Sequence, residues 1–240
     1  EKIFIPYSGQ RTYLAYGVQH DALMNLRYRF TSDYGMEYKE LDLRSKWFDG
    51  IPFGHNSNYY VSKEKYGKSN PEFFSTHRYK NFREFESATE LCYTNGITDE
   101  GDLDVSREIS VVKAAADSLI SFIKKDDRAV YFMFGRLDNA EAICHCPRCE
   151  AARKRFGGDA GIMIVFLNAL IREVRIRFAK KGETFQKKIV TFAYSSTIEP
   201  PVKDGKPISE KVIPDPVLYI RYAPIHADYS YSLSDPRQKE

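Results

Sequence analysis

The chain has 240 residues, enough for one large domain or two small ones. Its hydrophobic content of 42% and charged content of 29% are typical of a soluble globular protein with a sizeable core. The net charge of +3 implies no polyanionic partner, and no apolar run approaches the roughly 18 residues of a membrane helix. The sequence shows no signal peptide and does not begin with Met, so we expect a mature or excised segment of a larger protein.

The first 80 residues carry the weakest periodicity. We expect residues 1–20 to be an N-terminal segment from a preceding domain, and residues 21–240 to form the main domain. Residues 21–30 alternate late in the run, which predicts a strand. Residues 31–80 are polar and aromatic, and a loop of this length inside a compact domain is usually either functional or partly disordered; we interpret it as functional.

Helical and strand patterns alternate from residue 104 onward. Apolar residues recur on one face over 106–125, which predicts a helix with Asp104 or Ser106 as its N-cap. Residues 130–134 form a nearly continuous apolar run, as in a buried strand. The remaining predicted elements are a second amphipathic helix and two strands, over 160–181, 189–194 and 217–222.

This alternation predicts the fold class. Strands separated by helices favour βα units and a parallel sheet. We count about six candidate strands from residue 22 onward, two short of a closed barrel. We therefore predict an α/β fold, a (β/α)8 TIM-barrel-like domain that is incomplete in this segment and lacks its C-terminal part. The alternative is an open parallel α/β sheet.

The cysteines form the most distinctive motif. Three of the four lie within six residues, at Cys144, Cys146 and Cys149, and Cys92 lies in a short run upstream. Four thiolates that converge from two loops suit a tetrahedral Zn²⁺ ion. Such a site would be structural, because four protein sulfurs leave no open position for water.

These thiols have two alternative states. Two disulfides would also use four cysteines, but three cysteines this close would force one local and strained bridge. Reduced, inert thiols are the other alternative, and the spacing favours zinc over both. His145 could be a ligand too, but beside four cysteines such a histidine is more often a bystander that points to solvent.

Polar side chains follow the predicted strands, where sites form in barrels and open α/β sheets alike. Asp138 follows the most buried-looking strand by four residues and is the candidate general acid, with Glu141 as a weaker candidate. The candidate substrate-binding residues are His55, Asn56, Asn95, Asn139, Tyr194, Arg221 and His226.

Each of these residues also has a purely structural interpretation. Asp138 could cap a turn, the His55 loop could be an ordinary Asx turn, and a lone Arg221 more often pairs with a surface acid. A glycosidase also needs a second carboxylate across the cleft, for which Glu199 is only a weak stand-in.

Several short motifs occur in a recognisable order. They are His55-Asn56, Asn70-Pro-Glu-Phe-Phe74, Leu91-Cys92-Tyr-Thr-Asn95, Asp138 ahead of the cysteine loop, and Ala193-Tyr194 with Pro200. This order resembles a bacterial domain family of unknown function, DUF 4838, over roughly residues 50 to 226. The resemblance implies a glycoside-hydrolase-type barrel from secreted carbohydrate-degrading systems of gut bacteria, and hence a secreted, periplasmic or cell-surface location.

The cysteine layout is similar to a second, narrower group, the glycoside hydrolase family 42 β-galactosidases. Their Cys₄ zinc site combines one upstream cysteine with a C-x-C-x-x-C loop just after the strand that bears the acid/base. This chain departs at that strand end, where it reads Leu137-Asp138-Asn139 and those enzymes read Asn-Glu. The departure weakens the retaining acid/base role for Asp138 and leaves the structural zinc interpretation intact.

Three functional hypotheses follow. The leading one is a carbohydrate-active enzyme, a glycoside-hydrolase-like protein that acts on a complex glycan. The second is a non-catalytic glycan-binding barrel, which the missing second carboxylate keeps open. The third is a zinc-containing nucleic-acid-binding domain, suggested by the basic stretch 148–188. A solvated helix face explains that stretch better, so we expect no nucleic-acid partner.

Overall fold

The computed structural model describes residues 47–48, 50–52, 54–75, 90–138, 143–223, 230, 232 and 235–237. The predicted N-terminal segment and the predicted strand over 21–30 lie outside the described residues. No helix within the described ranges is long and apolar enough to cross a bilayer.

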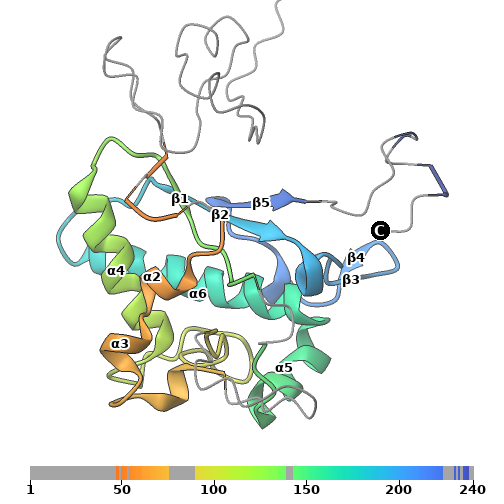
Figure 1. Cartoon of the computed structure of the whole chain (residues 1–240), viewed down its shortest axis with the longest axis horizontal. Helices are drawn as coiled ribbons and strands as arrows, with labels where there is room; N and C mark the ends of the chain where they lie inside the picture. The colour runs from red at the N-terminus through yellow and green to blue at the C-terminus, as the bar shows by residue number, and fades with distance from the viewer. Residues whose placement is uncertain are drawn as a thin grey trace, which may run out of the picture.

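The elements follow one another in the order shown in Figure 1. The helices are α2 (Ser57–Tyr60), α3 (Lys63–Tyr66), η2 (Pro71–Phe73), α4 (Val111–Lys125), α5 (Pro147–Phe156), α6 (Asp159–Ala179), η4 (Ser195–Thr197) and η5 (Glu210–Val212). The strands are β1 (Tyr131–Met133), β2 (Lys188–Ala193), β3 (Val202–Lys203), β4 (Lys206–Pro207) and β5 (Leu218–Tyr222).

The main sheet is parallel and has the order β1-β2-β5. Tyr131 pairs with Lys188, and Ile189 pairs with Leu218, so the three strands run in register in one direction. Trp47 adds a parallel bridge to Tyr131 on the far side of β1. The carboxyl ends of these segments therefore meet at one edge of the sheet.

Each face of the sheet is covered by different residues. Alternate residues of a strand point to opposite faces. Phe132 and Ile189 join the large core that α4 and α6 build on one face, while Met133 and Val190 pack with Trp47 on the other. Figure 1 shows α6 running beneath the sheet, with α4 crossing beside it.

The first long helix begins later than predicted. α4 starts at Val111, and the Ser110 side chain caps it by accepting a hydrogen bond from the Lys113 amide. Asp104 and Ser106, the predicted caps, instead hydrogen-bond to each other in the preceding turn. The prediction failed because cap residues are frequent throughout 104–110, so composition alone did not distinguish them.

The second long helix agrees with its prediction to within two residues, but a further helix was missed. α6 covers Asp159–Ala179, against 160–181 predicted. α5 directly precedes it and includes Cys149, in a stretch where the sequence predicts a cysteine loop. Pro147 occupies the first helical turn, a position where proline needs no N–H partner.

The fold class is confirmed at its coarser level. The described residues form a mixed α/β structure with a parallel sheet, and within them no closed barrel is formed. This arrangement is consistent with an incomplete or open α/β fold. The short helices α2, α3 and η2 occupy a region that the sequence had suggested was one long loop.

Candidate functional site

Three of the predicted site residues meet at the carboxyl edge of the sheet. The Tyr194 hydroxyl donates a hydrogen bond to Asp138 Oδ1 at 3.0 Å, and His55 Nε2 lies 3.8 Å from the same oxygen. The His55 and Tyr194 rings are 5.7 Å apart between centroids. We call His55, Asp138 and Tyr194 the strand-end cluster.

The three residues reach this position from separate parts of the chain. Asp138 follows β1, Tyr194 directly follows β2, and His55 follows the Trp47 bridge. The Asp138 side chain is 62% exposed and that of His55 31%, so a ligand can approach them. An imidazole, a carboxylate and a phenol offer both hydrogen-bonding groups and aromatic surface.

A close backbone approach sets the position of His55. A Cβ atom at Gly135 would collide with the carbonyl oxygen of Gly54, so glycine lets the loop lie directly against the end of β1. His55 Nδ1 then donates to the Arg136 carbonyl at 2.9 Å. That bond turns Nε2, the other ring nitrogen, toward Asp138.

Asn56 is a part of the same junction rather than of its exposed surface. It is fully buried, its amide donates to the Pro52 and Met133 carbonyls, and its Oδ1 accepts from the Gly135 amide. These bonds join the His55 loop to β1. The Asn56 side-chain amide therefore stabilises the junction of the loop with β1. Contact between Asn56 and a substrate stays a prediction.

The other predicted residues lie elsewhere. Asn95 is buried, and its side chain bonds the Val111 amide at the start of α4 and the Glu72 carbonyl. Arg221 lies on β5, paired in register with Phe192. Glu199 is exposed in the loop after η4. The candidates outside the described residues are Asn139, Glu141 and His226.

The four cysteines converge on a single point. The Sγ atoms of Cys92, Cys144, Cys146 and Cys149 all lie within 4.8 Å of one another, and none forms a disulfide. Cys92 Sγ is 3.7 Å from that of Cys149 and 3.9 Å from that of Cys146. A tetrahedral zinc ion bonded to sulfur at about 2.3 Å sets its ligands roughly 3.8 Å apart. The four-cysteine centre therefore has the donors and the spacing to hold such an ion.

Two different segments build this centre. Cys92 lies in the turn that joins the extended residue Leu91 to Asn95, and the other three cysteines lie at or just before the start of α5. The Thr94 hydroxyl lies 3.2 Å from Cys149 Sγ and 3.4 Å from Cys92 Sγ, as a supporting hydrogen-bond partner.

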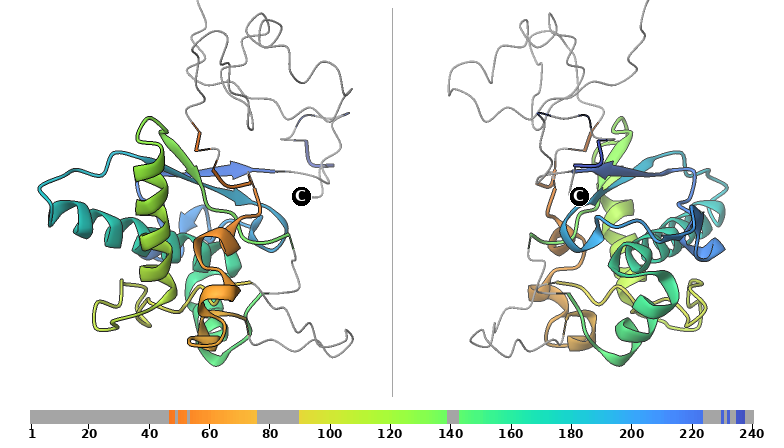
Figure 2. Two further views of the ribbon diagram at one scale, coloured as in Figure 1. Left: turned by 60° about the vertical axis from the view of Figure 1, so that its left-hand side comes forward. Right: turned by 90° about the vertical axis from the view of Figure 1, so that its right-hand side faces the viewer.

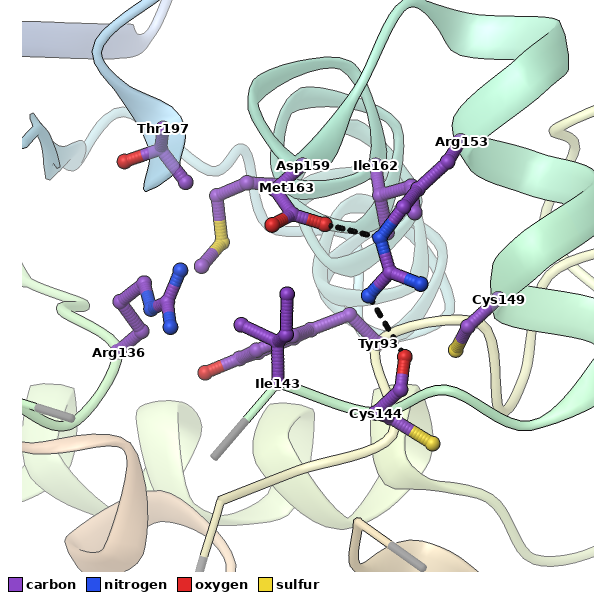
Figure 3. A pocket seen from close by; sticks show the side chains of 10 residues that line it. All are labelled: Tyr93, Arg136, Ile143, Cys144, Cys149, Arg153, Asp159, Ile162, Met163 and Thr197. Atoms are coloured by element: carbon purple, nitrogen blue, oxygen red, sulfur yellow. Dashed lines mark hydrogen bonds and ion pairs between the residues drawn. The ribbon is translucent and has the colours of Figure 1, made fainter. Parts of the chain in front are cut away.

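Arg153 braces the cysteine loop from the side. Its guanidinium donates to the Cys144 carbonyl at 2.7 Å and to Asp159 Oδ1 at 2.7 Å, as Figure 3 shows. His145 bonds Glu150 at the surface and is not among the converging groups. This agrees with its interpretation as a bystander.

The crowding of the thiols shifts their acidity. Hydrogen bonds with the neighbouring thiols, of which the one with Cys144 has the largest effect, raise the pKa of Cys92. A hydrogen bond with Cys92 lowers the pKa of Cys146 to about 6. Thiolates this close repel one another, so ionisation of all four needs a cation among them.

Sequence reasoning missed Glu90. Its side chain is fully buried, yet it carries a carboxylate paired with Arg136. Burial raises the pKa of Glu90, and the Tyr93 hydroxyl and the Arg136 guanidinium partly oppose that rise. No periodicity marks a buried acid in a short extended run, so only its place two residues before Cys92 could have drawn attention to it.

A small pocket lies beside the four-cysteine centre. Arg136, Tyr93 and Thr197 line one part of it, and Cys144 and Cys149 line another. Its volume is about 20 Å³, room for roughly one water molecule. In Figure 3 the hydroxyl end of Tyr93 points toward Arg136, away from the cysteine sulfurs.

Comparison with known proteins gave one match. Residues 4–240 match the family described as Domain of unknown function (DUF4838). Neither the curated proteins nor the solved structures contain a match to the chain. The match extends over nearly the whole chain, beyond the part that carries the motifs.

Proposed function

The chain belongs to the DUF4838 family, and we propose that it is part of a carbohydrate-active enzyme whose ligand binds at the strand-end cluster. One observation carries the proposal: His55, Asp138 and Tyr194 converge at the carboxyl edge of a parallel sheet, with Asp138 exposed and the other two half-buried. That edge is where ligands bind in α/β folds. Asp138 is the candidate acid, and the aromatic rings offer apolar surface beside it.

A ligand rich in hydroxyl groups suits this cluster. A carboxylate accepts hydrogen bonds from hydroxyls, an imidazole can donate or accept, and a phenol ring packs against the C–H face of a sugar. We propose that the four-cysteine centre holds a structural Zn²⁺ ion. The ion would fix the turn of Cys92 against α5, and it would take no part in the chemistry because its four positions are filled.

Binding to an oligosaccharide array tests the proposal. We expect the wild-type chain to bind a subset of oligosaccharides, and Asp138→Asn to weaken the affinity for the best of them by about tenfold or more, because a charge-assisted hydrogen bond is lost. Tyr194→Phe should weaken it less. Asp127→Asn alters an exposed residue before the start of β1, at the opposite end of the strand from the cluster, and should leave the affinity unchanged.

Turnover separates the enzyme from a second candidate, a glycan-binding module that does not cleave. That candidate is favoured by one observation: within the described ranges no second carboxylate joins Asp138, and Glu90, the nearest buried acid along the sheet edge, is fully enclosed. Mass spectrometry of the bound oligosaccharide after incubation should reveal shorter products if the chain is an enzyme. Binding without products would support the module, and no binding by the wild-type chain would contradict both.

A further inference from the structure

We infer that Glu90 is a positioning residue for the strand-end cluster, acting through the backbone of Arg136 and Leu137. The inference rests on the proposed function in one respect, namely that the cluster is where the ligand binds. Glu90 touches none of the three cluster residues, and its influence passes through the segment that carries Asp138.

The first step is the fixation of Glu90 itself. Glu90 Oε1 accepts a hydrogen bond from the Leu91 amide at 2.9 Å and another from the Tyr93 hydroxyl at 2.7 Å. Leu91 in turn forms an antiparallel bridge with Phe74. The carboxylate is therefore held rigidly in a short extended segment.

The second step is the contact across to β1. The other oxygen, Oε2, accepts from the Leu137 amide at 3.0 Å and lies 3.8 Å from Arg136 Nε. Leu137 directly precedes Asp138 in the chain. Glu90 thus holds the backbone one residue from the exposed carboxylate of the cluster.

The third step extends to the other two members of the cluster. The Arg136 carbonyl accepts the hydrogen bond that orients His55, and the Arg136 guanidinium bonds the Ser196 hydroxyl. Ser196 follows Tyr194 by two residues in η4. A shift of Arg136 would therefore move the supports of all three side chains.

Stability alone explains this arrangement poorly. A buried carboxylate costs free energy that a well-packed apolar side chain would not. Glu90 nevertheless uses both oxygens on backbone amides, one in its own segment and one beside Asp138. With two acceptor oxygens, Glu90 holds two backbone segments at a defined distance from each other. An apolar side chain could not do this.

Amide hydrogen exchange tests the inference without any ligand. Glutamine offers one acceptor oxygen where Glu90 uses two. Because Oε1 accepts from both Leu91 and Tyr93 while Oε2 accepts from Leu137 alone, we expect the glutamine oxygen to stay with Leu91 and Tyr93 in Glu90→Gln, which leaves the Leu137 amide unpaired. We expect the Leu137 amide to exchange about tenfold faster or more in this variant, with Ile171 in α6 and Val190 in β2 unchanged. Glu173→Gln is the matched control, since Glu173 is also buried and paired with an arginine, Arg177, but on α6.

Equal acceleration at all three amides would mean general destabilisation and would overturn the inference. So would an unchanged Leu137 amide, or acceleration of Leu137 in Glu173→Gln. If Glu90→Gln does not fold, Tyr93→Phe removes a single donor to the same carboxylate and keeps the ring. Leu137 should then exchange faster by a smaller factor, and no change would count against the inference.

A double-mutant cycle measured by ligand binding tests whether Glu90 acts through Asp138. On the oligosaccharide that the array identifies, Glu90→Gln should weaken binding in the wild-type background and have little further effect in Asp138→Asn. Additive losses would contradict action through Asp138. If the wild-type chain binds no oligosaccharide, the proposed function fails, while the exchange at Leu137 still decides whether Glu90 holds this segment.

Discussion

Tyr194 and Asp138 interact closely enough for one to change the acidity of the other. The hydrogen bond to Asp138, together with some burial and the negative charge, raises the pKa of Tyr194. Ionising the phenol would lose its donated hydrogen bond and place two negative charges side by side.

We therefore expect Asp138→Asn to lower the pKa of Tyr194 toward the ordinary value of about 10. Titration of ¹³C-labelled tyrosine by NMR measures this, with Tyr194→Phe to assign the signal. Asp127→Asn should leave the titration as it is. A Tyr194 pKa that is the same in Asp138→Asn and the wild type would contradict the contact.

Glu90 makes the stability of the chain depend on pH. Burial raises the pKa of Glu90 in the folded state, against the opposing effects of Tyr93 and Arg136. The neutral form is therefore favoured by folding. The stability it contributes is present in full below the unfolded pKa of about 4.3 and declines as pH rises through the folded value.

Glutamine at this position does not titrate, which isolates the effect. The free energy of unfolding of the wild type, minus that of Glu90→Gln, should fall as pH rises above roughly 4.3 and then level off. Urea denaturation of both proteins between pH 4 and pH 8 gives this difference. A difference that grows with pH would show that the pKa of Glu90 is lowered in the folded state, contrary to the prediction.

Thr94 supports the sulfurs of the four-cysteine centre. Its buried hydroxyl contacts both Cys92 and Cys149. Replacement by Val keeps the shape and removes the hydrogen bond, so Thr94→Val should lower zinc affinity by about tenfold. Competition with a chromophoric chelator measures the affinity, and Thr191→Val, a buried threonine on β2, is the control. Equal affinities in both variants would remove Thr94 from this role.

At the scale of elements, the parts predicted best were those with long periodic patterns. α4, α6, β1, β2 and β5 were all expected near their observed places, because their apolar residues repeat at helical or strand spacing. α5 was missed because its ten residues carry few apolar side chains, and its buried face consists of Cys149, Ala152 and Phe156.

The start of α4 depends on the cap at Ser110. This residue is fully buried, and its hydroxyl accepts from the Lys113 amide. Ser110→Ala should lower the free energy of unfolding by about 1 kcal/mol, as loss of an N-cap usually does. Urea denaturation measures the change, and Ser106→Ala, at the cap position expected from the sequence, should cost less. The reverse order would mean that the helix begins earlier than Val111.

The candidate site was predictable where chemistry leaves a local signature. Cysteine spacing pointed to the four-cysteine centre, and polar residues just after strands pointed to Asp138 and Tyr194. The role of Asn56 at the junction and the burial of Glu90 depend on contacts between segments more than 30 residues apart in sequence. Which distant segments contact each other cannot be read from a single sequence, so these two roles were not predicted.

At the scale of the whole molecule, the two centres share a segment. Glu90 holds the backbone beside Asp138, and Cys92, two residues later, belongs to the four-cysteine centre. Figure 2 shows, from two further sides, the sheet above and α5 below it. A change at the cysteines is therefore expected to reach the strand ends.

Chelation of the metal should loosen this shared segment first. We expect faster amide exchange over residues 90–97 and 144–156, and at Leu137, while α6 and β2 keep their protection, because only the former are tied to the sulfurs. Exchange measured by mass spectrometry with and without chelator tests this. Uniform loss of protection would show that the ion holds the whole domain, and no change would show that it holds none of it.

Anomalous X-ray diffraction at the zinc edge, on crystals of the zinc-loaded chain, tests the central claim most directly. The account predicts one peak equidistant from the sulfurs of Cys92, Cys144, Cys146 and Cys149, with His55, Asp138 and Tyr194 together at the carboxyl edge of the sheet. Disulfides among the four cysteines, or density without an anomalous peak between them, would contradict the metal centre. A strand-end cluster that is dispersed in the same crystals would contradict the binding site.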